Sequence, residues 1–181
     1  MLRKANKPMS VPAGIDVKVD GGQITISKGN HRLSRNIHSD VKVSFNSNTR
    51  TILVEASDVA EEKTVKAQLG TICAHISNMI RGLDKGFTKE LIIKGTGYKA
   101  KIVGKKIVLS LGYSHDVECE IPDTVTIEMP SQTEINLKSH CKESLGAFKD
   151  YLVRVRKLCR FKGKGILDKS VPFVAKVVRK T

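Results

Sequence analysis

The feature that most constrains the fold of this chain is an internal duplication. The segment Ile24–Gly29 resembles Ile107–Gly112 at an offset of 83 residues, and Ile37–Val43 resembles Ile121–Ile127 at an offset of 84. A repeat of this length indicates how many structural units the chain has, even before any secondary structure is assigned. The 181 residues are enough for either one mid-sized domain or two small ones. The duplication therefore predicts two similar units in tandem.

Within each copy, the order of apolar residues predicts antiparallel strands. Apolar residues alternate with polar ones, as in strands that bury one face. The alternating residues of the first copy are Ile15, Val17, Val19, Ile24, Ile26, Val41, Val43, Phe45, Ile52 and Val54. Residues suited to tight reversals separate the stretches, at 20–22 and 46–48 in the first copy and at 104–106 and 130–132 in the second. We therefore expect β-hairpins in both copies.

Each copy then changes to a helical period, with apolar residues every three or four positions. These residues are Val65, Leu69, Ile72, Cys73, Ile76 and Met79 in the first copy, and Leu145, Phe148, Leu152, Val155 and Cys159 in the second. Asp58 with Glu61 resembles a capping box, and Gly82 suits the end of the first helix. The sequence predicts an α+β protein with two tandem similar domains, each a small antiparallel β-sheet with one α-helix packed on it.

The charge of the chain is large and unevenly distributed. The net charge is +14, and residues 138–181 carry 13 basic and 3 acidic side chains, a net charge of +10. Residues 1–83 have a net charge of +5, and residues 84–137 have a net charge of −1. A surface selected only for solubility carries positive and negative side chains interspersed. This asymmetry therefore favours a polyanionic partner for the C-terminal part. Nucleic acid is the leading partner class, and an anionic membrane surface is the second.

The basic C-terminal part also has internal order. On a helix with about 100° per residue, Lys142, Lys149, Arg156 and Arg160 fall within about 40° of one another. This predicts a cationic stripe along one edge of the second helix. The stripe leads into residues 161–166, Phe-Lys-Gly-Lys-Gly-Ile, where glycines let the backbone approach a phosphate closely and Phe161 offers a ring for stacking.

An enzymatic function has weaker support. Ser139, His140 and Asp150 have the residue types of a hydrolase triad, but no nucleophile-elbow sequence surrounds the serine. Gly95 and Gly97 resemble part of a phosphate loop, yet an alternating strand pattern follows them instead of a helix, so a strand bend is the better interpretation. A small hydrolase or nucleotide-using enzyme therefore remains a minor alternative.

Membrane association and metal binding are also weakly supported. No run of roughly 18 apolar residues is present, and no apolar stretch follows the basic N-terminus, so we expect no secretory signal. A peripheral membrane module would need an exposed apolar face beside its basic one. The cysteines are Cys73, Cys119, Cys141 and Cys159, widely spaced and without a CxxC pair. This spacing favours reduced cysteines in an intracellular protein and gives no metal-ligand pattern.

The chain resembles a known family along most of its length. The stretches that carry the resemblance are Val11–Ile15, Gly86–Lys89, Gly95–Ala100, Leu109–His115, Thr133–Ile135 and Phe161–Ile166. They resemble ribosomal protein six of the large subunit, of bacterial or organellar type. The resemblance implies a protein without catalytic activity or cofactor, located in ribosomes of the bacterial cytoplasm or of an organelle. It further implies binding to large-subunit ribosomal RNA mainly through the C-terminal domain, near the sarcin-ricin loop where translational GTPases act.

Two departures from the family pattern lie in the motif itself. Bacterial members usually have tyrosine at the position of Phe161, which preserves stacking but removes a phenol hydrogen bond. They also tend to have Pro-Glu-Pro where this chain has Leu158, Cys159 and Arg160. Without those prolines, we expect the second helix to run longer.

These observations give a domain plan and a set of site residues. We expect a basic arm over residues 1–10, a first α+β domain over 11–82, a second over 83–166 that ends in the RNA-binding motif, and a basic tail over 167–181. The expected partners are large-subunit ribosomal RNA, neighbouring large-subunit proteins and nearby translational GTPases, with no membrane, small-molecule substrate or metal. The predicted RNA-binding residues are Lys142, Lys149, Arg154, Arg156, Lys157, Arg160, Phe161, Lys162, Gly163, Lys164, Gly165, Lys169, Lys176, Arg179 and Lys180.

Overall fold

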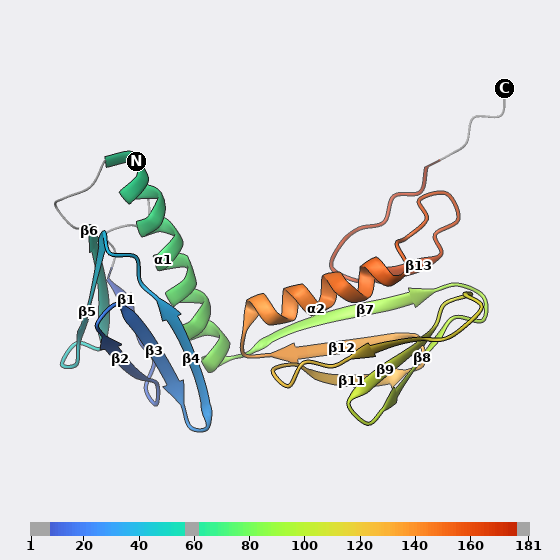
Figure 1. Cartoon of the computed structure of the whole chain (residues 1–181), viewed down its shortest axis with the longest axis horizontal. Coiled ribbons are helices and arrows are strands. Elements are labelled where there is room, and N and C mark those ends of the chain that lie inside the picture. Colours follow the sequence, from blue (N-terminus) through green and yellow to red (C-terminus); the bar gives the residue numbers. More distant parts are fainter. Residues whose placement is uncertain (1–7, 57–61, 177–181) are drawn as a thin grey trace. The chain divides into compact units, whose positions relative to one another are not determined.

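The computed structural model describes residues 8–56 and 62–176. The chain forms two compact units, Met1–Gly86 and Phe87–Thr181 (Figure 1). This confirms the tandem arrangement that the duplication predicts. Each unit is α+β, with short antiparallel strands and one long helix.

Within its described residues, the first unit contains six strands followed by helix α1. The strands are β1 (Met9–Ser10), β2 (Asp16–Asp20), β3 (Gln23–Lys28), β4 (His31–Asn36), β5 (Val41–Asn46) and β6 (Thr51–Ala56), and α1 spans Glu62–Asp84. They form two three-stranded antiparallel sheets, ordered β1-β6-β5 and β2-β3-β4.

The second unit repeats this plan and adds one strand after its helix. Its elements are β7 (Phe87–Lys94), β8 (Lys99–Val103), β9 (Lys106–Ser110), β10 (Val117–Glu120), β11 (Thr126–Ser131), β12 (Glu134–Ser139), α2 (Lys142–Val155) and β13 (Gly165–Asp168). Its sheets are ordered β11-β12-β7-β13 and β10-β9-β8. The pairing of β13 with β7 is antiparallel and sets Gly165 opposite Lys94 and Asp168 opposite Leu91.

The internal repeat corresponds to matching strands in the two units. Its first segment covers most of β3 in the centre of one small sheet, and its counterpart covers most of β9 in the centre of another. The sequence predicts a single sheet in each unit, whereas each unit has two. Apolar alternation predicts that a segment is a strand but does not show which strands pair, so it does not reveal the division into two sheets.

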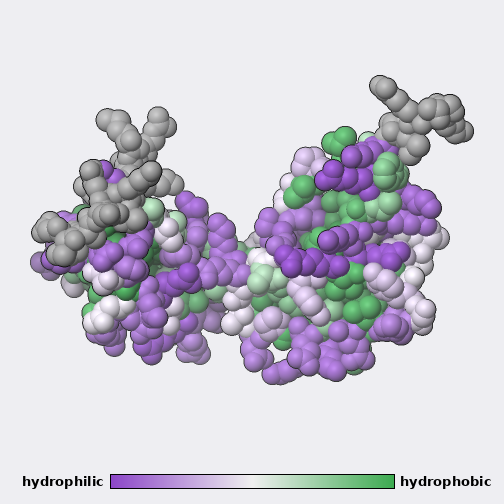
Figure 2. Space-filling view, turned by 45° about the horizontal axis from the view of Figure 1, so that its top comes forward, coloured by the Kyte–Doolittle hydropathy of each residue, from purple (hydrophilic) through white to green (hydrophobic). Residues whose placement is uncertain are grey.

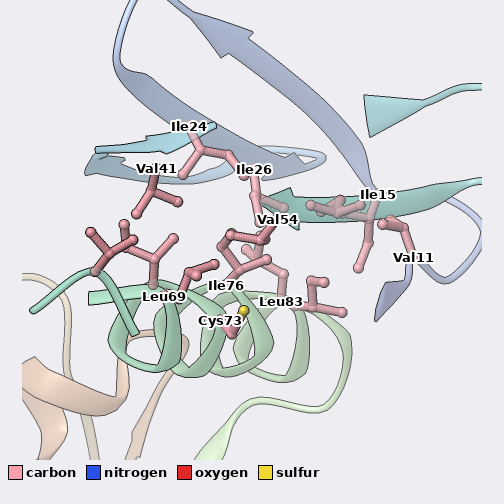
Figure 3. Packing of buried hydrophobic residues seen from close by; sticks show 14 residues of the cluster. Val11, Ile15, Ile24, Ile26, Val41, Val54, Leu69, Cys73, Ile76 and Leu83 are labelled. Atoms are coloured by element: carbon pink, nitrogen blue, oxygen red, sulfur yellow. The ribbon is translucent and has the colours of Figure 1, made fainter. Parts of the chain in front are cut away.

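Both helices hold their unit together by burying an apolar face. In the first unit, α1 packs on β3, β5 and β6, and Ile26, Val54 and Ile76 are at most 3% exposed. Figure 3 shows these side chains meeting between the helix and the strands. In the second unit, α2 packs on β7, β12 and β13 through Leu145 and Leu152. Full burial of one such side chain contributes about 1.5–3 kcal/mol.

Several expected boundaries differ from the structure. Helix α1 continues past Gly82, because the residue that takes the left-handed conformation after the helix is Gly86, with φ of 72°. Strand β1 lies inside the expected N-terminal arm, and β13 crosses the expected start of the tail at residue 167. Asp58 and Glu61, the proposed capping box, lie outside the described residues.

Helix α2 is shorter than the sequence predicts. It ends at Val155, and Arg156 has φ of −140° and ψ of 92°, an extended conformation. The expected stripe therefore does not form, because Arg156 and Arg160 are not on the helix. Among the described residues, no helix has the length and apolar character needed to cross a membrane. Hydrophilic residues cover most of the surface in Figure 2, with smaller hydrophobic patches between them.

Candidate nucleic-acid interface

The segment that joins α2 to β13 forms a closed loop, residues 156–165, here called the basic loop. Three backbone hydrogen bonds close it. Ile166 N–H donates to Arg156 C=O at 3.1 Å, Cys159 N–H donates to Lys164 C=O at 2.9 Å, and Gly163 N–H donates to Cys159 C=O at 2.8 Å. The first of these bonds uses a carbonyl that a longer helix would have used. The basic loop is thus a defined structure and not a charged tail.

Glycine is required at one position of the basic loop. Gly165 has φ of 138°, and a Cβ atom there would lie 2.8 Å from Leu158 Cα and 2.8 Å from Lys157 O. Both neighbours are backbone atoms, so no side-chain movement relieves the overlap. At Gly163, with φ of 67°, a Cβ atom would lie 3.4 Å from a ring carbon of Phe173. The glycines of the motif therefore first serve to fold the loop tightly on itself.

A pocket of about 620 Å³ opens beside the basic loop, here called the loop pocket. Five of the predicted cations line it, and within the described part of the chain no carboxylate does. Loops from the β-strands contribute two tyrosines to the same pocket. The lining residues are Tyr98, Tyr113, Arg154, Val155, Arg156, Lys157, Cys159, Lys162 and Lys164. Folding thus gathers cations that span eleven positions of the sequence around one hollow.

The two tyrosines hold Arg156 in place. The guanidinium carbon of Arg156 lies 4.7 Å from the centroid of the Tyr113 ring, a cation–π arrangement. The Tyr113 hydroxyl donates to Val155 C=O at 2.8 Å, so the ring is tied to the last residue of α2. Hydrogen bonding to Tyr113, and then to Tyr98, raises the pKa of the Arg156 guanidinium above its already high ordinary value. A planar guanidinium held this way keeps donors for a phosphate.

Neither tyrosine is among the site residues that the sequence predicts. Two glycines, Gly95 and Gly112, indicate the position of Tyr98. A Cβ atom on Gly95 would lie 2.5 Å from the Tyr98 ring, and one on Gly112 would lie 3.0 Å from it. The glycines leave room for the ring of Tyr98. The stretch that resembles a phosphate loop is therefore a turn between β7 and β8 that seats an aromatic side chain.

The pKa of the Cys159 thiol reflects the positive charge around the loop pocket. Hydrogen bonds from the backbone N–H groups of Lys162 and Phe161, followed by the charges of Lys162 and Arg156, lower the pKa of this exposed thiol. Burial opposes that shift but does not outweigh it. An environment that favours a thiolate also favours a phosphate oxygen at the same place.

The other predicted site residues lie apart from the pocket lining or are engaged elsewhere. Lys149 Nζ lies 2.9 Å from Asp150 and 3.6 Å from the buried Asp168, so it anchors α2 to β13. Lys142 begins α2, about 20 Å along the helix from its last turn. Lys169 pairs with Glu90 at 2.7 Å.

The remaining residues of the prediction lie around the outside of the basic loop. Phe161 is 59% exposed, and Arg160 is also exposed. The backbone N–H of Lys176 donates to Arg160 C=O at 3.0 Å, which attaches this part of the tail to the basic loop. Arg179 and Lys180 lie outside the described residues.

The residues considered for catalysis have structural contacts. The Ser139 hydroxyl donates to Thr124 C=O at 2.7 Å and accepts from Cys141 N–H at 3.1 Å, and the residue is buried at the end of β12. Asp150 is paired with Lys149. Among the described residues, no group of three or more His, Cys, Asp or Glu side chains is placed to hold a metal ion. These contacts do not support the hydrolase alternative.

Comparison with known proteins matches both units. The family model for ribosomal protein L6 matches residues 11–86 and, a second time, residues 94–169. The large ribosomal subunit protein uL6 of Colwellia psychrerythraea is 43% identical over 166 residues, which are 92% of this chain and 92% of the relative. The uL6 proteins of Glaesserella parasuis and Lactiplantibacillus plantarum are 42% and 39% identical over 166 residues. The chain therefore belongs to the ribosomal protein L6 family.

Proposed function

We propose that this chain binds large-subunit ribosomal RNA, with the loop pocket as its principal contact. Membership of the family makes the chain a structural, non-enzymatic protein of the large ribosomal subunit. The observation that carries the RNA proposal is the loop pocket itself, where five cations and two tyrosines meet and no carboxylate of the described residues lines the wall.

The chemistry of the loop pocket suits phosphate groups of folded RNA. Arg and Lys side chains neutralise phosphates and release the cations condensed on the RNA. The closed backbone of the basic loop holds Lys162 and Lys164 in one geometry, so the entropy of ordering the loop backbone is spent on folding and not on binding. The exposed ring of Phe161 beside these cations offers a stacking surface for a base.

The family resemblance extends this proposal to a location. The RNA partner would lie near the sarcin-ricin loop, next to the place where translational GTPases bind, with neighbouring large-subunit proteins around it. The basic charge of residues 138–181 supports placing the main contact in the second unit.

A footprinting experiment tests the proposal. We expect the purified full-length chain to protect a discrete segment of large-subunit ribosomal RNA from hydroxyl radicals, and to co-sediment with large subunits. Replacing both Lys162 and Lys164 with Ala should weaken the protection. Lys101→Ala is the matched control, since this exposed lysine on β8 does not line the loop pocket. Absence of any protected segment, or equal protection by the double variant, would refute the proposal.

A further inference from the structure

The first unit has a cavity of its own, which the proposed function does not use. It has a volume of about 430 Å³. One wall is the end of β4 and the residues that follow it, and the other wall is the exposed side of α1. Its floor is mainly apolar and includes Ile37, Ala67 and Ile72. Small-molecule sites combine such a floor with a few polar groups.

The polar groups around this cavity are chemically mixed. Arg35 Nη2 lies 3.1 Å from His75 Nε2, and because a guanidinium only donates, Nε2 is the acceptor in this pair. This hydrogen bond holds a cation at the cavity. His38, which also lines it, pairs with Asp40 at 3.2 Å. Within the described part of the chain, the lining residues include no carboxylate.

Gln68 supplies the most specific indication of a ligand. Its side-chain oxygen Oε1 is buried and has no hydrogen-bond partner among the described residues, although Gln68 lines the cavity. A buried acceptor without a donor costs about 1–3 kcal/mol. Because Oε1 has less than 1 Å² of accessible surface, a ligand N–H or O–H group would reach it, and remove that cost, once the Gln68 amide turns toward the cavity.

We propose that this cavity binds one unpaired RNA nucleotide. The base lies on the apolar floor, an amino or imino N–H of the base donates to Gln68 Oε1, and the phosphate faces the Arg35 guanidinium. The choice of RNA as the polymer rests on the proposed function, but the site is separate from the loop pocket and uses different residues.

A nucleotide matches the cavity better than other anions do. Inorganic phosphate leaves the apolar floor empty. An acidic peptide satisfies the charge of Arg35 but carries no flat apolar group for Ile37 and Ile72. A nucleotide combines a flat ring, ring-edge N–H donors and a negative charge, which is how unpaired bases are read by proteins.

Methyl NMR of the full-length chain tests this inference. Ile37, Ile72 and Ala67 methyl signals report the cavity, and the Gly163 and Gly165 amide signals report the basic loop. The titrants are the four nucleoside monophosphates and single-stranded hexaribonucleotides. We expect saturable shifts of the three methyl signals that persist when Lys162 and Lys164 are both replaced by Ala.

Two cavity variants and one matched control sharpen the test. Gln68→Leu removes the acceptor and Arg35→Met removes the cation. We expect each to weaken binding at the cavity by about fivefold to tenfold, which corresponds to one hydrogen bond or one charge-assisted interaction. Arg81→Met is the control, because Arg81 is an exposed cation on α1 that does not line the cavity. The methyl spectrum of each variant also shows whether it is folded.

The outcomes separate this site from the loop pocket. Shifts at Gly163 and Gly165 without shifts at Ile37 and Ile72 would overturn the inference while leaving the proposed function intact. Shifts only at the cavity would support the inference and count against the proposed function. Equal shifts with a hexaglutamate peptide or with inorganic phosphate, or unchanged affinity in both cavity variants, would show that the cavity does not recognise a nucleotide.

Discussion

At the scale of single residues, Gly165 decides the path of the basic loop. The loop passes so close to its own backbone that a methyl group at residue 165 would overlap Leu158 Cα and Lys157 O, both at 2.8 Å. The positive φ of 138° adds a conformational cost for any other residue.

Replacing this glycine should therefore destabilise the protein. We expect Gly165→Ala to lower the free energy of unfolding by about 2–3 kcal/mol, since backbone strain and steric overlap add. Gly104→Ala is the control, because Gly104 has φ of 60° but a Cβ atom there would meet no atom within 4 Å. The Gly104→Ala substitution should lower the free energy of unfolding by only about 1–2 kcal/mol. Urea unfolding of both variants measures the difference, and equal costs would contradict close packing at Gly165.

Tyr113 acts through Arg156, and this makes its contribution measurable. We expect Tyr113→Leu to weaken binding to large-subunit ribosomal RNA about threefold, because the substitution removes the cation–π interaction that positions Arg156. In Arg156→Met, the same Tyr113 substitution should have little further effect, since the two residues act as one unit.

A double-mutant cycle by filter binding checks this dependence. Tyr151→Leu is the matched control, because Tyr151 is 50% exposed on α2 and stacks on Phe148, outside the loop pocket. Additive losses for Tyr113 and Arg156 would mean that the tyrosine does not position the arginine.

At the scale of elements, β13 joins the basic loop to the core of the second unit. Strand β13 pairs with β7, and Asp168 at its end is buried between cations on both sides. The Asp168 carboxylate lies 3.6 Å from Lys89 Nζ and 3.6 Å from Lys149 Nζ, and it accepts hydrogen bonds from the hydroxyl and the backbone N–H of Ser170. One buried charge thus ties β7, α2 and the start of the tail together.

The protonation of Asp168 should link stability to pH. Burial alone raises the pKa of this carboxyl, but the Ser170 hydrogen bonds and the two lysine charges together lower it below its ordinary value. Because this pKa is lower in the folded state, the charged carboxylate stabilises the protein at pH values above the unfolded-state pKa, about 4. That stabilisation is lost as the pH falls through the folded-state pKa.

Asp168→Asn tests this linkage. At pH 7 we expect the variant to lose about 1–3 kcal/mol of unfolding free energy, because the charged hydrogen bonds are weakened. Below pH 4 the difference from the unsubstituted chain should shrink. Asp123→Asn, an exposed partner of Lys105, should change stability little at pH 7. A pH-independent deficit in Asp168→Asn would contradict an electrostatic role.

At the scale of the whole molecule, the asymmetric charge predicts how RNA affinity depends on salt. We expect Lys162→Ala and Lys164→Ala each to weaken binding and to reduce the slope of log affinity against log salt by roughly one unit for each phosphate that is no longer neutralised. Lys142→Ala should leave the slope closer to its original value, since Lys142 lies at the far end of α2 from the basic loop. Fluorescence anisotropy across a salt series measures all three. An unchanged slope in both loop variants would remove these lysines from the interface.

The end of α2 differs from the sequence-based expectation because it depends on a hydrogen bond between distant residues. The apolar period of α2 extends to Cys159, yet the helix ends at Val155 because Ile166 N–H binds Arg156 C=O. No local pattern reveals such a bond. Likewise, no local pattern shows that Lys149, which the helical stripe predicts to bind RNA, also pairs with Asp168 of another element.

By itself, the sequence determined the duplication, the α+β class and the concentration of positive charge near the C-terminus. These follow from periodicity and composition, which are local properties of the chain. Only the tertiary structure decided that each unit has two sheets, that the basic loop closes on Gly165, and that Tyr98 and Tyr113 join it. The physical reason is that hydrogen bonds and packing between residues far apart in sequence exist only once the strands have paired.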